Sequence, residues 1–189
     1  MKMSDEIIME RIKNGDEEAL GEVMKKYKDK IYNFIYKFIR DRERALELAQ
    51  EVFVRVYFKA DTYKGTSSIS TWIYKIATNL SISELRRRKI VKWVSFDSIS
   101  PSWEKEKYSE NYESYNLLES LLKKIKSKYK IPLVLKEIEG FSIEEVANML
   151  NIPEGTVKSR INRAKKTIKQ ELEAMEKKIS PQLKQNLIF

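Results

Sequence analysis

The chain has 189 residues, of which 42% are hydrophobic, and this is enough to bury one large core or two small ones. It contains no cysteine and no histidine, so disulfide bonds and thiolate chemistry are excluded and the commonest general base and metal ligand is absent. Few candidate groups are thus left for an enzyme mechanism. We expect a protein that is not an enzyme and that uses no cofactor, no metal and no small-molecule substrate.

The net charge of +9 is unevenly distributed along the chain. Residues 1–96 carry 20 basic and 14 acidic side chains, residues 97–119 carry 2 and 6, and residues 120–189 carry 15 and 8. Two basic blocks around an acidic segment favour a protein that contacts one polyanion, a nucleic acid or a membrane surface, at two places. No run approaches the roughly 18 apolar residues of a spanning helix, and the acidic start does not resemble a signal peptide. We expect a cytoplasmic protein that is not embedded in a membrane.

The sequence contains only 5 Gly and 4 Pro and no sustained alternation of β-branched residues, so an all-α fold is predicted. A first helix is expected over Asp5–Lys13. Asp16 is a candidate N-cap of a second helix, which either continues through Asp29 or breaks there. Asp41 is expected to cap a third helix with a buried apolar face.

The polar face of the third helix carries Glu47, Gln50 and Glu51. An ordinary solvated face is the simplest interpretation, and a docking surface for a partner protein is the alternative. Carboxylates four residues apart could also share a cation in a nuclease, although no further acidic residue is placed to complete that site.

The loop at residues 61–70 is expected to expose Tyr63 and Lys64, and Ser70 is a candidate N-cap of a fourth helix. On that helix we expect Trp72 at the edge of the core and Asn79 in solvent. The helix ends in a run of basic residues that we expect to be exposed. Aromatic rings on which bases can stack, a side-chain amide and cations that can contact phosphates together favour a surface for single-stranded nucleic acid. Its candidate residues are Tyr63, Lys64, Trp72, Asn79, Arg86, Arg87 and Arg88.

Loss of helical periodicity predicts a flexible linker at residues 91–115, between two small helical domains at 1–90 and 116–175. Residues 176–189 form a tail that we expect to fray. Three large aromatic side chains are unusual in a tether and are candidate contacts to a domain or a partner. They are Trp93, Phe96 and Trp103.

The second domain is expected to begin with a helix over residues 116–130, followed by a helix with Pro132 in its first turn. Ser142 and Glu145 form a candidate capping box at the start of a helix-turn-helix, and Asn151 suits a left-handed C-terminal position. The second helix of this motif has an apolar stripe at Val157, Ile161, Ala164, Ile168 and Leu172. Its other face provides donors for phosphates and bases, namely Lys158, Ser159, Arg160, Asn162, Arg163 and Lys165. A merely solvated basic helix is the alternative.

Two sets of motifs are found in the two predicted domains. The first set is GDEEAL at 15–20, AQEVF at 49–53 and STWIYKIATNLSISELRRRK at 70–89. The second is EIEGFSIEEVANMLNIPEGTVKSRINRAKKTIK at 137–169. Together they resemble the sigma-70 family of bacterial RNA polymerase sigma factors, in the small extracytoplasmic-function (ECF) group. Arg44, Leu46 and Ile69 depart from the residues common in the family, and with Ile69 before Trp72 we expect base capture to depend more on Tyr63.

The resemblance implies an alternative sigma factor whose partners are core RNA polymerase, through its β′ clamp and β flap, and promoter DNA. Glu47, Gln50 and Glu51 would then bind the clamp, and the surface from Tyr63 to Arg88 would hold the −10 strand. Lys158, Ser159, Asn162 and Arg163 would face the −35 duplex, and Arg160 and Lys165 its phosphates. The ECF group also implies an anti-sigma factor. A helix-turn-helix regulator that acts without being a polymerase subunit is the alternative.

Overall fold

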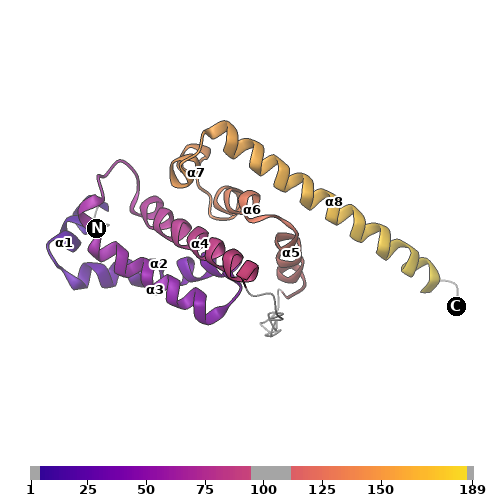
Figure 1. Cartoon of the computed structure of the whole chain (residues 1–189), viewed down its shortest axis with the longest axis horizontal. Helices are drawn as coiled ribbons and strands as arrows, with labels where there is room; N and C mark the ends of the chain where they lie inside the picture. Colours follow the sequence, from indigo (N-terminus) through magenta and orange to yellow (C-terminus); the bar gives the residue numbers. More distant parts are fainter. Residues whose placement is uncertain (1–4, 95–111, 187–189) are drawn as a thin grey trace. The chain divides into compact units, whose positions relative to one another are not determined.

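The computed structural model describes residues 5–94 and 112–186, and throughout these ranges the regular structure is helical. The described chain forms two compact units (Figure 1), one built on the four helices before residue 95 and the other on the helices after residue 111. The expected all-α fold with two helical domains is therefore confirmed.

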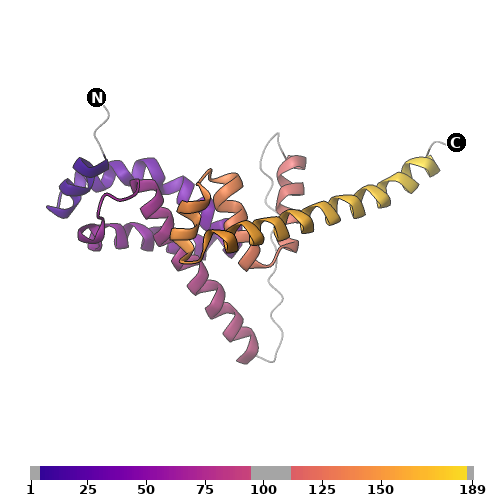
Figure 2. The same ribbon diagram turned by 90° about the horizontal axis from the view of Figure 1, so that it is seen from above.

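The N-terminal unit contains α1 (Asp5–Lys13), α2 (Glu17–Ile39), α3 (Arg42–Phe58) and α4 (Ile69–Val94), with a short 3-10 turn, η1 (Ala60–Thr62), before α4. Helices α2, α3 and α4 pack against one another, and α1 packs on α2 and η1 (Figure 2). The first helix has the predicted bounds, and α2 continues through the position where a break was considered.

Aspartate caps define the starts of α2 and α3 as predicted. The Asp16 carboxylate accepts a hydrogen bond from the Ala19 backbone N–H, and the Asp41 carboxylate accepts one from the Arg44 N–H. Each cap satisfies a donor that has no partner within its own helix. Between these helices Arg40 adopts a left-handed conformation with φ 52°, which ends α2 and turns the chain into α3.

The core of this unit lies where the apolar stripes of α2, α3 and α4 meet. Phe34 is fully buried, and its ring packs edge-on against both Phe38 and Tyr74. Tyr74 and Thr78 of α4 are also buried. The largest fully buried side chains of the unit include Met9, Ile12, Ile31, Phe34, Ile35, Leu48 and Ile73.

The C-terminal unit contains α5 (Tyr112–Lys124), α6 (Ser127–Leu133), a π-helical turn η2 (Val134–Ile138), α7 (Ile143–Leu150) and α8 (Glu154–Asn186). Both α5 and α6 pack on α8. The second half of α8 continues beyond the helices that pack on it (Figure 2). Helices α4 and α5 overlap the two ends of the predicted linker at 91–115, and α8 continues into the predicted tail at 176–189.

Two details of the linker region follow from those boundaries. Residue 93 belongs to the end of α4, whereas Phe96 and Trp103 lie outside the described residues. The proposed packing of the three linker aromatics therefore stays a prediction.

Pro132 lies in the interior of α6 and not in the first turn of a new helix. Proline has no N–H to donate to the preceding turn, which disturbs the regular helical ladder. Directly after α6 the chain widens into the π-helical turn, where the Glu139 N–H donates to the Val134 carbonyl at 3.0 Å. Gly140, with φ 83°, then ends this segment.

The helix-turn-helix forms as the sequence predicts. The Ser142 hydroxyl accepts from the Glu145 N–H at 3.1 Å, and the Glu145 carboxylate accepts from the Ser142 N–H at 2.8 Å. These reciprocal bonds are the capping box. Asn151 is left-handed, with φ 52°, and separates α7 from α8.

Candidate nucleic-acid and protein interfaces

The donor face of α8 is accessible over its first three turns. Lys158, Ser159, Asn162, Arg163 and Lys165 are exposed, and Arg160 is half-buried. The opposite face is anchored by Val157, Ile161 and Ala164, which are buried. The predicted stripe does not extend further: Ile168 is half-buried and Leu172 is exposed, because this part of α8 leaves the helices packed on it.

Two cations of this face are held by residues outside the helix-turn-helix. Arg163 donates to the Tyr129 hydroxyl of α6 at 3.2 Å. Lys165 lies 2.9 Å from a carboxylate oxygen of Glu137 in the π-helical turn. Motif spacing within α8 could not reveal either partner, because both come from residues about 30 positions earlier in the chain.

The basic end of α4 is organised by one buried carboxylate, which the sequence reading missed. Glu84 is 3% exposed and its oxygens accept from Arg44 at 3.1 Å, Arg87 at 2.9 Å and Arg88 at 2.8 Å. Burial alone would raise the pKa of Glu84, but the hydrogen bonds from the three guanidinium groups outweigh it and lower the pKa to about 2.

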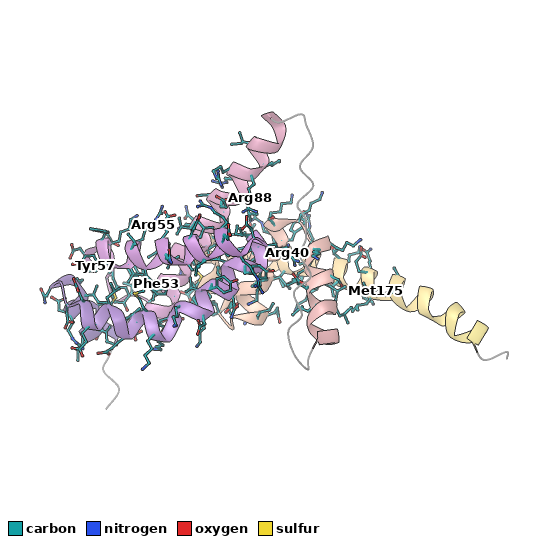
Figure 3. All side chains as sticks on the ribbon, turned by 90° about the horizontal axis from the view of Figure 1, so that it is seen from below. Arg40, Phe53, Arg55, Tyr57, Arg88 and Met175 are labelled. Carbon is teal, nitrogen blue, oxygen red and sulfur yellow. The ribbon has the colours of Figure 1, made fainter. Side chains whose placement is uncertain are left out.

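Arg88 is the most constrained of the predicted −10 cations (Figure 3). Besides Glu84 it binds the Asp41 carboxylate at 3.0 Å and the carbonyl of Ile39 at 3.0 Å, so it joins α4 to the turn between α2 and α3. The expectation that the whole basic run is exposed was wrong for Arg88, which is half-buried. Arg86 and Arg87 are exposed as predicted.

Tyr63 does not have the expected exposure. Only 6% of it is accessible, its hydroxyl donates to the Ser67 carbonyl at 2.6 Å, and its ring packs edge-on against Trp72. The sequence suggested an exposed loop aromatic, but the ring fills the space beneath the loop instead. The remaining −10 candidates agree with expectation: Trp72 is half-buried, and Lys64 and Asn79 are exposed.

The start of α4 also differs from the prediction. The cap is Ser68 and not Ser70, because the Ser68 hydroxyl accepts from the Thr71 N–H at 3.1 Å. The first residue of the helix, Ile69, donates its N–H to the Asp5 carboxylate of α1 at 2.8 Å. The loop therefore depends on a residue from the beginning of the chain.

The accessible side of α3 carries two parallel strips. The charged strip contains ion pairs of Arg44 with Glu47 at 2.6 Å and of Arg55 with Glu51 at 2.5 Å. The predicted docking residues Glu47 and Glu51 thus already have local partners. Gln50 lies in the second strip, which is mostly apolar and lines a groove.

That second strip is one wall of an apolar groove between α2 and α3, with a volume of about 970 Å³. Its wall on α3 includes Leu46, Val54 and Phe58, which are 52%, 54% and 77% exposed. Leu20 and Met24 face them from α2. Exposed apolar patches of this kind mark interaction sites in soluble proteins. In Figure 3, Phe53 and Tyr57, which also line the groove, are labelled on α3.

Two further features bear on the function. Within residues 5–94 and 112–186 no cluster of three or more acidic side chains is placed to bind a metal ion. In the same part of the chain no helix has the length and hydrophobicity required to cross a membrane.

A helix-turn-helix unit with a donor-rich helix, joined to a second helical unit with a basic end and an apolar groove, defines a DNA-binding protein that also has a protein partner.

Comparisons with known proteins identify the family. The Sigma-70 region 2 model matches residues 23–90, and the Sigma-70, region 4 model matches residues 115–168. The ECF RNA polymerase sigma factor SigW of Bacillus subtilis is 31% identical over 188 residues, which cover 91% of this chain and 98% of SigW. The RNA polymerase sigma-H factor of Pseudomonas aeruginosa is 28% identical over 183 residues, which cover 90% of this chain and 95% of that protein.

Solved structures share the fold. CnrH, in complex with the cytosolic domain of CnrY, has a TM-score of 0.68 at 19% identity and matches 90% of this chain and 97% of its own. RpoE of Bartonella quintana, in complex with the anti-sigma factor NepR, has a TM-score of 0.64 at 20% identity over 81% of this chain and 96% of its own. The chain belongs to the sigma-70 family, in the ECF group, and is an alternative sigma factor that directs promoter-specific transcription initiation.

Proposed function

We propose that the N-terminal unit binds core RNA polymerase through the groove between α2 and α3, in the cytoplasm. The observation that carries this proposal is the exposure of Leu46, Val54 and Phe58 on one wall of that groove. Burying these side chains against the β′ clamp would remove apolar area from water, which favours association. Gln50 lies within the groove lining and can hydrogen-bond to the partner, whereas Glu47 and Glu51 provide a charged rim.

The two DNA-reading roles are divided between the units. Lys64, Trp72, Asn79 and Arg86 contact the non-template strand of the −10 element, since the first, third and fourth are exposed and the Trp72 ring is partly accessible. Arg87 and Arg88 face the same strand from the Glu84 cluster, which consists of Glu84 and the three arginines bound to it, Arg44, Arg87 and Arg88. Tyr63 supports the loop from beneath and does not stack on a base, because its ring is buried.

The C-terminal unit reads the −35 duplex with α8. Lys158, Ser159, Asn162 and Arg163 face the base edges, and Arg160 and Lys165 contact phosphates. These side chains lie in the first three turns of the helix, on the side opposite its buried anchors. We further propose that this unit rests on the β flap of the polymerase. The protein has no catalytic activity of its own.

An anti-sigma factor is the further partner that we propose, because the ECF group to which the chain belongs implies one. Its binding would cover the surfaces used for polymerase and DNA. The structural relatives CnrH and RpoE are each solved with another protein bound, the cytosolic domain of CnrY and NepR respectively.

The test is reconstituted transcription. Purified core polymerase is mixed with this protein and with genomic DNA fragments, and transcript starts are mapped with and without it. We expect discrete new starts that share two upstream elements. Absence of any new start, together with tight binding of duplex DNA by the protein alone as a dimer, would instead support a regulator that is not a polymerase subunit.

A further inference from the structure

The beginning of α1 lies against the beginning of α4, 64 residues further along the chain. Asp5 accepts a hydrogen bond from the Ile69 N–H at 2.8 Å, while Ser68 accepts one from the Thr71 N–H at 3.1 Å. The first four N–H groups of a helix have no partner within the helix. Two of these donors on α4 are therefore satisfied by side chains, one from the preceding loop and one from a different helix.

The loop between η1 and α4 is held from two sides. From beneath, the Tyr63 hydroxyl donates to the Ser67 carbonyl at 2.6 Å. From the side of α1, the Asp5 carboxylate accepts the Ile69 N–H at the end of the loop, and Glu6 lies beside Gly65, where a Cβ would be 3.8 Å from its carboxylate. Gly65 itself has φ +70°, a conformation that favours glycine. Burial raises the pKa of Tyr63, and the negative charges of Asp5 and Glu6 raise it further.

These contacts connect the N-terminal helix to the residues that face the −10 strand. Lys64 lies within the loop, and Trp72 lies in the first turn of α4, with its ring against Tyr63. If the loop were free, binding of a DNA strand would have to order it, and that loss of conformational entropy would weaken binding. A contact that fixes the loop in advance therefore strengthens binding without touching the DNA.

We propose that Asp5 is a positioning residue for promoter reading, which fixes the loop at residues 63–68 and the start of α4 in the conformation that receives the −10 strand. The inference rests on the proposed role of this loop. Asp5 acts through Ile69 and not by contact with DNA, since a carboxylate would repel phosphates. Its charge also lies at the N-terminus of a helix, where negative charge is favourable.

Three variants separate positioning from a general effect on stability. Asp5→Ala removes the acceptor for the Ile69 N–H. Asp5→Asn keeps an acceptor oxygen and should restore most of the function. Glu10→Ala is the matched control, because Glu10 also lies on α1 but pairs only with Lys13, at 3.5 Å on the surface, among the ion pairs of the described residues.

The first measurement is hydrogen exchange of the Ile69 amide in the full chain. We expect Asp5→Ala to raise the exchange rate by about five- to tenfold, which corresponds to the loss of one capping hydrogen bond. Asp5→Asn should stay close to the wild type, and Glu10→Ala should be unchanged. An unchanged rate in Asp5→Ala would overturn the proposal.

The second measurement is binding of single-stranded DNA by each variant in complex with core polymerase. The probe is a randomised oligonucleotide pool from which the wild-type complex has selected its ligands. We expect Asp5→Ala to bind about threefold to tenfold more weakly while its affinity for core polymerase is unchanged. Equal binding by Asp5→Ala and the wild type would overturn the inference. If the wild-type complex selected no sequence, the proposed −10 role itself would be wrong, whatever the exchange at Ile69.

Discussion

Arg163 of α8 and Tyr129 of α6 form a pair in which the guanidinium donates to the phenol oxygen at 3.2 Å and lies 5.9 Å from the centre of its ring. Lys128 approaches the same ring, with its ammonium 4.8 Å from the centre. Hydrogen bonds from Arg163 and Lys128 lower the pKa of Tyr129. A candidate base-reading side chain is therefore restrained by a residue outside the helix-turn-helix, before any DNA is bound.

Tyr129→Phe should weaken base discrimination by the C-terminal unit. The substitution keeps the ring under Arg163 but removes the hydroxyl that accepts its hydrogen bond, so the guanidinium samples more orientations. We expect discrimination at one base pair of the −35 element to fall by about twofold to fivefold. Binding of the complex with core polymerase to duplexes that differ at single base pairs measures this effect. Tyr36→Phe in the other unit is the control, and equal discrimination by wild type and Tyr129→Phe would contradict the role.

Arg163→Ala and Lys165→Ala should have different effects on sequence preference. If Arg163 contacts a base, its loss should cost about 1 to 3 kcal/mol of binding free energy and relax the preference at one position. Lys165, which is held 2.9 Å from Glu137, should contact a phosphate, so its loss should weaken all sequences alike. Affinity measured across a library of −35 duplexes distinguishes the two outcomes. Uniform losses for both variants would show that the assignment of Arg163 is incorrect.

Val54→Ser and Phe58→Ser should each reduce affinity for core polymerase. Both side chains are exposed in the groove, at 54% and 77%, so the isolated protein should lose little stability. Burial of either chain against a partner removes apolar surface from water, and its loss should weaken binding by roughly tenfold. Fluorescence anisotropy with labelled protein measures the affinity. Ile7→Ser is the matched control, because Ile7 is 51% exposed but lies on α1; a similar loss in this control would argue against the groove.

Glu84→Gln should destabilise the N-terminal unit. The amide cannot neutralise Arg44, Arg87 and Arg88, which would be left close together without their shared counter-charge. We expect the free energy of unfolding to fall by about 2 to 3 kcal/mol. Urea denaturation followed by circular dichroism measures it. Glu47→Gln is a suitable comparison, since Glu47 also pairs with Arg44 but is exposed, and it should have a much smaller effect.

The contribution of Glu84 should also depend on pH. Its pKa in the folded protein is about 2, below the ordinary value of 4.5, so the unfolded chain binds the proton more readily. The stabilisation is therefore complete above the ordinary pKa and is lost as the pH falls towards 2. The difference in unfolding free energy between wild type and Glu84→Gln should be constant near neutral pH and shrink in acid. A difference that stays constant down to pH 2 would contradict this assignment.

Local chemistry explains what the sequence predicted correctly. The Asp16 and Asp41 caps, the capping box of Ser142 with Glu145 and the left-handed Asn151 all depend on residues within a few positions of one another. Such signals can be read along the chain without knowledge of the tertiary structure. They were enough to locate the start of α8, and with it the donor face.

Long-range packing explains what the sequence did not predict. Tyr63 is polar enough to suggest exposure. Its hydroxyl, however, donates a hydrogen bond to the Ser67 carbonyl, and its ring packs edge-on against Trp72. Glu84 resembles any other acidic residue on a solvated helix until α3 brings Arg44 to it. The docking strip was read from charge alone, so the exposed apolar wall beside it was missed. The groove forms only when α2 packs next to α3, so the sequence of α3 alone could not reveal it.

The Glu84 cluster changes the effective charge of the basic end of α4. The sequence shows four successive cations at residues 86–89, but Arg87 and Arg88 already share Glu84, and Arg88 also binds Asp41. A cation that is paired within the protein has fewer counterions to displace from a DNA strand, because it must first give up its carboxylate. The salt dependence of the proposed −10 binding contributed by this segment should therefore correspond to fewer than four neutralised phosphates. Pairing with Glu84 and Asp41 should thus make the proposed −10 contact less sensitive to ionic strength.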